Sequence, residues 1–168
     1  MRTRLLAIAG VSLLSVLLQA SATATAQPAT TARGEYLVRI MDCGGCHTPG
    51  ALGGKSDFSA SLAGSNIGFR IPGAGVLYPP NLTPDPATGL GRWTNEQIVR
   101  AVRHGERPDG RRLAPVMPWP SYSALTDADA AAVAAYLKSL PPQPGRAPAR
   151  VAKGDRPNAP YVDIVTPR

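Results

Sequence analysis

The sequence contains few of the residues from which disulfides and metal sites are usually built. Among 168 residues there are two cysteines and two histidines, and aromatic residues make up 5% of the chain. A structural zinc ion needs about four thiolate or imidazole ligands. Only Cys43, Cys46, His47 and His104 are available, and two of these are adjacent. The composition therefore disfavours a zinc site, and it leaves no cysteine outside that group for a stabilising disulfide.

The sequence also lacks the pattern of a nucleic-acid-binding protein. Charged residues form 17% of the chain, and the arginines do not alternate with aromatic side chains. The formal net charge is +7, from 18 lysines and arginines against 11 acids, and it becomes +5 without Arg2 and Arg4. A mild positive balance favours encounter with acidic partner surfaces.

No apolar run is long enough to cross a membrane with ease. The run at 5–18 has 14 residues, whereas a membrane span needs about 20. It follows Arg2 and Arg4 and precedes the small residues 21–26, which is the three-part pattern of a secretory signal. We expect cleavage after Ala26 and a periplasmic location, with an uncleaved anchor as the alternative.

Both cysteines and one histidine stand together in the run Cys43-Gly44-Gly45-Cys46-His47. The form C-x-x-C-H is the one by which a c-type haem is attached covalently to its protein. Each thiol can bind one vinyl group of a single porphyrin, and the histidine that follows is carried under the ring to ligate the iron. The two glycines leave this tight turn free of side chains. The motif predicts one covalent haem c.

A redox-active dithiol is the main alternative for the same cysteines. Such thiols usually begin a helix, because a helix N-terminus lowers the thiol pKa. Here Tyr36, Leu37, Ile40 and Met41 form an apolar helical stripe between residues 34 and 42. We therefore expect the cysteines at the C-terminal end of a helix, where a thiolate is disfavoured.

The remaining chain alternates between loops and helices. Residues 48–92 contain nine glycines and six prolines, which excludes long elements, although 67–71 and 76–78 flank a turn and predict a small hairpin. A capping box at Thr94 begins a helix that stops at Gly105. A last helix is predicted between Thr126 and Leu140, and two prolines end it.

The predicted organisation has four parts. Residues 1–26 are a signal peptide, 27–33 a disordered lead, 34–142 a single domain and 143–168 a basic tail rich in proline. The tail has five lysines and arginines against two acids. Its composition predicts an extended segment, either disordered or laid on a partner.

An iron held by His47 has one more axial position, for which the chain offers three candidates. Met41 lies too close to Cys43 to reach the opposite haem face and is expected in the core. His104 ends an amphipathic helix beside arginines, where a surface imidazole is ordinary. Met117 lies in a loop stiffened by three prolines, and a weak thioether ligand needs such a rigid loop. We predict His47 and Met117 as the iron ligands, with a packing role as the alternative for Met117.

The order of these features resembles class I monohaem cytochrome c. The runs at 80–85, 91–94 and 117–122 are similar to those of the cytochrome c subunits of bacterial periplasmic alcohol, aldose and nicotinate dehydrogenases. The resemblance covers about residues 33–142. It implies an all-α fold, with three or more helices around one covalent haem, long loops rich in glycine and proline, and a small hairpin. Several such proteins carry two or three haem domains, whereas this chain has one C-x-x-C-H motif.

The resemblance also implies roles around the haem. Asn81 lies in a motif that packs around the haem in these proteins. Trp93 and Trp119 are expected to pack against the porphyrin, with an indole N–H near a propionate. Arg92 or Arg112 is expected to pair with a propionate. Ordinary core tryptophans and surface arginines are the competing interpretation.

Together these features predict electron transfer in the periplasm rather than catalysis by the chain itself. Electrons would come from a dehydrogenase partner and pass to an oxidase or another respiratory component. Ligation by histidine and methionine raises the haem potential, and a carbonyl of the turn Pro79-Pro80 is expected to orient the His47 ring. The alternatives are a freely diffusible carrier and, if Met117 is not bound, a five-coordinate haem that reacts with peroxide or a small gas.

Overall fold

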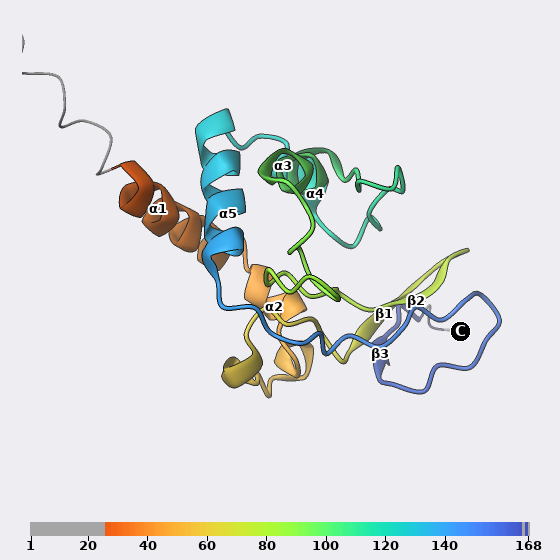
Figure 1. The fold of residues 1–168 in the computed structure, drawn as a ribbon. Helices are drawn as coiled ribbons and strands as arrows, with labels where there is room; N and C mark the ends of the chain where they lie inside the picture. The colour runs from red at the N-terminus through yellow and green to blue at the C-terminus, as the bar shows by residue number, and fades with distance from the viewer. Residues whose placement is uncertain (1–25, 166, 168) are drawn as a thin grey trace, which may run out of the picture.

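The computed structural model describes residues 26–165 and 167, so the predicted signal peptide lies outside the described residues except for its last position. The structure is mainly helical with one small sheet (Figure 1), as predicted. Within the described residues, no helix is both long and apolar enough to pass through a bilayer. The helices are α1 (Ala26–Ile40), α2 (Cys43–His47), α3 (Asn95–His104), α4 (Trp119–Tyr122) and α5 (Asp127–Ser139), with 3-10 turns at Ala51–Gly53 and Phe58–Ala60.

The first and last long helices cross in close contact and form the centre of the core. A Cβ atom on Gly34 of α1 would collide with the carbonyl oxygen of Ala132 in α5 and would come within 2.7 Å of the Tyr136 side chain. Glycine therefore lets the two backbones touch. An ion pair between Arg33 and Asp129, with 2.8 Å between nitrogen and oxygen, lies beside this crossing.

Helix α1 begins well before the predicted start at residue 34. The segment 27–33, predicted as a disordered lead, is helical. This segment has no stripe of apolar residues at helical spacing, so its sequence pattern does not predict a helix. Contact with α5 through Gly34 and Arg33 explains the difference, because most helical stability in proteins comes from tertiary packing.

The start signals of the two later helices are confirmed. Thr94 accepts a hydrogen bond from the amide of Gln97, whose side chain accepts one from the amide of Thr94, and Gly105 ends α3 with φ of 66°. Thr126 accepts a hydrogen bond from the amide of Asp129 at the start of α5. Helix α3 packs against both α4 and α5, so these caps set the position of the segment between them.

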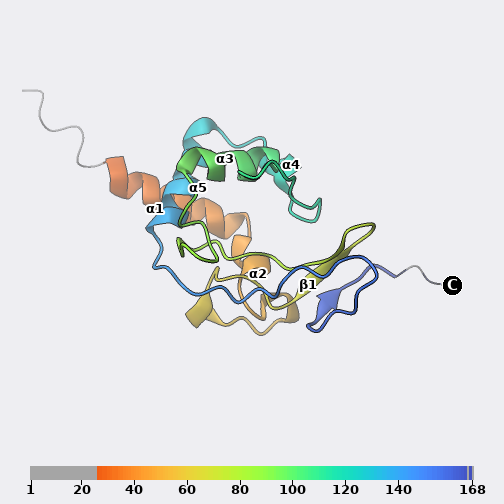
Figure 2. The same ribbon diagram turned by 45° about the vertical axis from the view of Figure 1, so that its right-hand side comes forward.

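The predicted hairpin is also confirmed, and the tail completes its sheet. Strands β1 (Gly68–Ile71) and β2 (Gly75–Leu77) are antiparallel, and β3 (Tyr161–Val162) pairs with β1 in parallel, in the order β2-β1-β3. The tail is extended, as its composition predicts. Instead of being disordered, it lies along its own domain to reach β1 (Figures 1 and 2).

Candidate haem site

The cysteine motif forms its own short helix immediately after α1. The cysteines were predicted at the end of a helix, but α1 ends at Ile40 and Cys43 begins α2. Asp42 adopts the left-handed conformation with φ of 53°, and its carboxylate accepts a hydrogen bond from the amide of Gly45 at 3.2 Å. A side chain on Gly45 would overlap that carboxylate, whereas one on Gly44 meets nothing closer than 3.6 Å. The two glycines thus have different tasks, and Gly45 is the one that the turn requires.

The electrostatics of the thiols are unlike those of an activated dithiol. Burial raises the pKa of Cys43 to about 11, with smaller contributions from the charges of Asp42 and Cys46. Burial and the Asp42 carboxylate also raise the pKa of Cys46. Reactive thiols need a lowered pKa. The environment therefore supports the interpretation of these cysteines as attachment points rather than as a redox pair.

His47 is held in one orientation by the main chain. Its side chain is buried, and Nδ1 lies 2.7 Å from the carbonyl oxygen of Pro80. A carbonyl can only accept, so Nδ1 carries the proton and Nε2 keeps its lone pair. Burial lowers the pKa of His47 and the bond to Pro80 partly opposes that shift, which keeps the ring neutral at pH 7. The expectation of a carbonyl from the Pro79-Pro80 turn is confirmed.

The loop that carries Met117 is fixed at both ends. The Met117 amide donates to the carbonyl of Ala114 at 3.0 Å, and its carbonyl accepts from the amide of Trp119 at 2.8 Å. Before the loop, the Leu113 amide donates to the carbonyl of Gly105 at the end of α3, at 2.7 Å. Figures 1 and 2 both place α4, which follows this loop, beside α3, and α2 in the opposite part of the fold. The two predicted iron ligands therefore come from different parts of the structure.

Tyr122 joins the methionine loop to the cysteine motif. Its hydroxyl donates to the carbonyl of Met41 at 2.8 Å, just before α2. Burial, with smaller contributions from the nearby Cys43, Cys46 and Asp42, raises the pKa of Tyr122 to about 12. The bond to Met41 places the phenol beside the turn that leads into the cysteine motif. The sequence motifs predict no role for Tyr122. The one signal that could have pointed to it is its position as the last residue of the run at 117–122, which carries the family resemblance.

Trp119 carries the observation that best tests whether a haem fits. Its ring lies on Gly105, where a Cβ would come within 2.7 Å of the indole nitrogen, and the Arg112 guanidinium lies 4.7 Å from the ring centroid. The indole nitrogen Nε1 is buried and has no hydrogen-bond partner within the described part of the protein. An unpaired buried donor is costly. A carboxylate of a bound cofactor, such as a haem propionate, could accept a hydrogen bond from this indole N–H and pair with the Arg112 guanidinium.

The other predicted residues take varied positions. Trp93 is half-buried, packs against the core and has the Arg107 guanidinium 5.5 Å from its ring centroid. Met41 also packs against the core, as predicted. His104 is exposed, and Arg92 is exposed as well.

Asn81 does not present a free polar group to a cofactor. Its oxygen accepts from the amide and the hydroxyl of Thr83 at 2.9 and 2.8 Å. Its nitrogen donates to Thr88 Oγ1 at 3.0 Å and to the carbonyl of Gln143 at 2.8 Å. An amide side chain has two acceptor and two donor positions, and all four are used by protein. Asn81 therefore supports the loop next to Pro80, and its place in a haem pocket stays a prediction.

Residues 31–141 match the family model for cytochrome c. The chain belongs to the cytochrome c family. Relatives of this cytochrome include the cytochrome c subunit of a quinone-dependent alcohol dehydrogenase from Gluconacetobacter polyoxogenes, 43% identical over 115 residues, which are 68% of this chain and 23% of the relative. A second is a subunit of nicotinate dehydrogenase from Pseudomonas putida, 40% identical over 117 residues, or 70% of this chain and 9% of that protein. A third is the cytochrome subunit of fructose dehydrogenase from Gluconobacter japonicus, 40% identical over 115 residues, or 68% and 22%.

Family membership confirms the predicted cofactor. Members carry covalent haem c, and this cytochrome has one C-x-x-C-H motif, at Cys43, Cys46 and His47, so it binds one haem. The chain spans less than a quarter of the length of the three relatives named above. Their substrates and partners are properties of much longer proteins.

Proposed function

We propose that this cytochrome carries single electrons through one haem c, attached to Cys43 and Cys46, with His47 and Met117 as its axial iron ligands. The observation that carries the proposal is the bond from His47 Nδ1 to the carbonyl of Pro80, which leaves Nε2 unprotonated in a buried position. A metal-bound histidine almost always donates its other ring N–H in this way. The haem supplies a reversible change between ferrous and ferric iron.

The protein residues hold the cofactor and exclude water and substrate. With His47 and Met117 both holding the iron, no position on it would be left for a substrate, so we propose electron transfer without a catalytic residue in this chain. The buried Nε1 of Trp119 and the Arg112 guanidinium over its ring would hold a propionate, to which the indole N–H can donate. Tyr122 fastens the methionine loop beside the cysteines. Together these contacts keep the site closed and rigid, and a rigid site keeps reorganisation small during electron transfer.

The proposed donor is a dehydrogenase, and the proposed place is the periplasm. What supports the donor is the similarity to cytochrome subunits of alcohol, fructose and gluconate dehydrogenases. What supports the location is the secretory pattern of residues 1–26 and the periplasmic assembly of c-type haem. Electrons then pass to an oxidase or another respiratory component.

Removing the cysteines tests the cofactor attachment. In cells that assemble c-type haem, we expect the double variant Cys43→Ala, Cys46→Ala to lose all haem that survives a denaturing gel, because both thioether bonds are gone. Gly44→Ala, in the same turn, keeps it, since a Cβ there finds room. Haem staining of the gel measures the result. Covalent haem in the double variant would contradict the proposed attachment.

Purification from the native host at moderate salt tests the partnership. We expect the cytochrome to elute with a dehydrogenase and to be reduced by it when the substrate of that enzyme is added. The measurement is the rise of the ferrous haem absorption in the shared fraction. Elution as a monomer that no co-purified enzyme reduces would support the diffusible carrier instead.

A further inference from the structure

The tail beyond the family match makes direct contacts with the loops around His47. The family model ends at residue 141. From there the chain passes the loops beside α2 before it reaches the sheet, and both Figure 1 and Figure 2 show this path. The contacts near α2 involve main-chain groups of Gln143, Gly145 and Arg146, which are far along the chain from β3.

One set of contacts holds the loop that carries Pro80. The Gln143 amide donates to Thr83 Oγ1 at 3.1 Å, and the Gln143 carbonyl accepts from Asn81 at 2.8 Å. The Gly145 amide donates to Thr88 Oγ1 at 2.9 Å. Asn81 and Thr83 are 3% and 1% exposed, so their ends of the two bonds to Gln143 are buried, whereas the bond from Gly145 to Thr88 is exposed. Because Asn81 follows Pro80 directly, the tail fixes the carbonyl that His47 Nδ1 uses.

A second set holds the main chain of His47 itself. The Arg146 amide donates to the carbonyl of Ala63 at 2.8 Å, and the next amide, that of Gly64, donates to the carbonyl of His47 at 2.8 Å. Gly64 has φ of 95°, and a Cβ there would lie 3.1 Å from both the Ala147 side chain and the Asn81 amide nitrogen. The segment next to His47 is therefore enclosed between the tail and the Asn81 loop.

We propose that residues 143–147 are positioning residues for His47, fixing both its ring hydrogen bond and its main chain. The inference rests on the proposed ligation of iron by His47. It assigns to the proximal tail a role in setting the orientation of the ligand, whereas the distal tail at β3 stabilises only the sheet. The histidine ring is then constrained by a segment that lies about 100 residues later in the sequence.

Three variants separate the proximal tail from the rest. In Gly145→Val, a Cβ would come within 2.8 Å of the Thr88 side chain, so the variant pushes the tail from its contact. Thr83→Val removes the hydroxyl that binds Gln143 and Asn81, and Thr83→Ser restores it. The matched control is Tyr161→Ala, which loosens the tail at β3 only, where Tyr161 contacts Arg70.

The measurement is proton exchange at His47 Nδ1, followed by NMR on the haem-loaded protein. The amide of Leu137, buried in α5, reports global unfolding and serves as the internal reference. Relative to it, we expect exchange at Nδ1 to be about tenfold faster in Gly145→Val and Thr83→Val, the equivalent of one hydrogen bond. Thr83→Ser and Tyr161→Ala are expected to match the wild type.

Two results contradict the inference, and they are distinguishable from failure of the proposed function. One is an unchanged relative rate in Gly145→Val although trypsin cleaves its tail faster at Arg146. The other is equal acceleration in Tyr161→Ala. If Gly145→Val does not fold, Gln143→Pro takes its place, because it removes the tail amide that donates to Thr83 Oγ1 and leaves the bond between Thr83 and Asn81 intact. A wild-type protein whose His47 ring shows no shift from bound iron contradicts the proposed ligation itself.

Discussion

Replacing Met117 by leucine is expected to remove the methionine–iron charge-transfer band from the visible spectrum of the oxidised protein. Leucine keeps the bulk of the side chain but has no sulfur to bind iron. Axial ligands tune haem potentials over about 0.8 V, and methionine raises the potential. We therefore also expect the midpoint potential to fall by on the order of 0.1 V. Spectroscopy and a redox titration measure the two effects.

Met41→Leu is the matched control, because Met41 is the other methionine of residues 27–168 and packs against the core. It is expected to keep both the band and the potential. The absence of the band in the wild type would disprove the proposed ligation by Met117. A band that persists in Met117→Leu and disappears in Met41→Leu would show that Met41 is the ligand instead.

Gly34→Ala is expected to lower the free energy of unfolding by about 2–3 kcal/mol, the usual cost of forcing an extra group into a packed core. The added Cβ would collide with the Ala132 carbonyl and push α1 away from α5. Helix propensity alone predicts the opposite sign, since alanine is favoured over glycine by about 1 kcal/mol. The sign of the change therefore tests the close crossing.

Denaturant unfolding of the haem-loaded protein, followed by circular dichroism, measures this effect. Gly44→Ala in α2 is the control, because its Cβ meets only Thr48 Oγ1 at 3.6 Å. Its stability is expected to stay within about 1 kcal/mol of the wild type. Stabilisation by Gly34→Ala would show that the helices have room at their crossing.

The helices that could be predicted from sequence are those with local signals. The capping groups Thr94 and Thr126 and the stop at Gly105 are side-chain or backbone features that act within a few residues. The early part of α1 has no such signal, because Gly34 and Arg33 stabilise it through contacts with α5. A local sequence pattern does not predict contacts between residues about 100 positions apart in the chain.

The candidate site divides in the same way. The C-x-x-C-H motif by itself predicts covalent attachment of a haem. The hydrogen bond from the His47 ring to Pro80 could also be predicted, because a histidine that binds a metal usually donates its other ring N–H to an acceptor. The role of Asn81 could not be predicted, because its partners include the main-chain carbonyl of Gln143 in the tail. Every residue has the same main-chain carbonyl, so the sequence does not show which carbonyl a side chain will bind. The proline content of the tail predicts that the tail is extended, but it does not predict the path of the tail along the domain.

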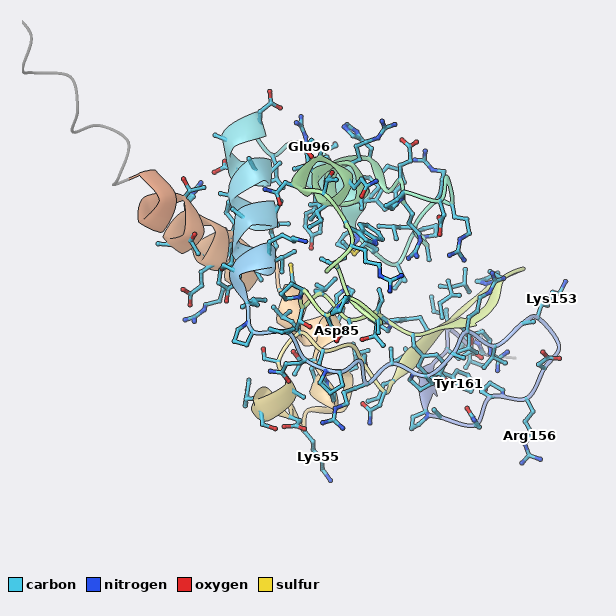
Figure 3. All side chains as sticks on the ribbon, viewed as in Figure 1. Lys55, Asp85, Glu96, Lys153, Arg156 and Tyr161 are labelled. Carbon is cyan, nitrogen blue, oxygen red and sulfur yellow. The ribbon has the colours of Figure 1, made fainter. Side chains whose placement is uncertain are left out.

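The ordered path of the tail makes the charge of the molecule uneven. Residues 143–167 hold four lysines and arginines against two acids, whereas the much longer stretch 27–142 holds 11 against nine. Figure 3 shows Lys153 and Arg156 pointing outward from the far loop of the tail, away from the helices. A fixed charge separation of this kind gives the molecule an electric dipole. An acidic partner would therefore meet the tail side first, at a rate that falls as salt screens the field.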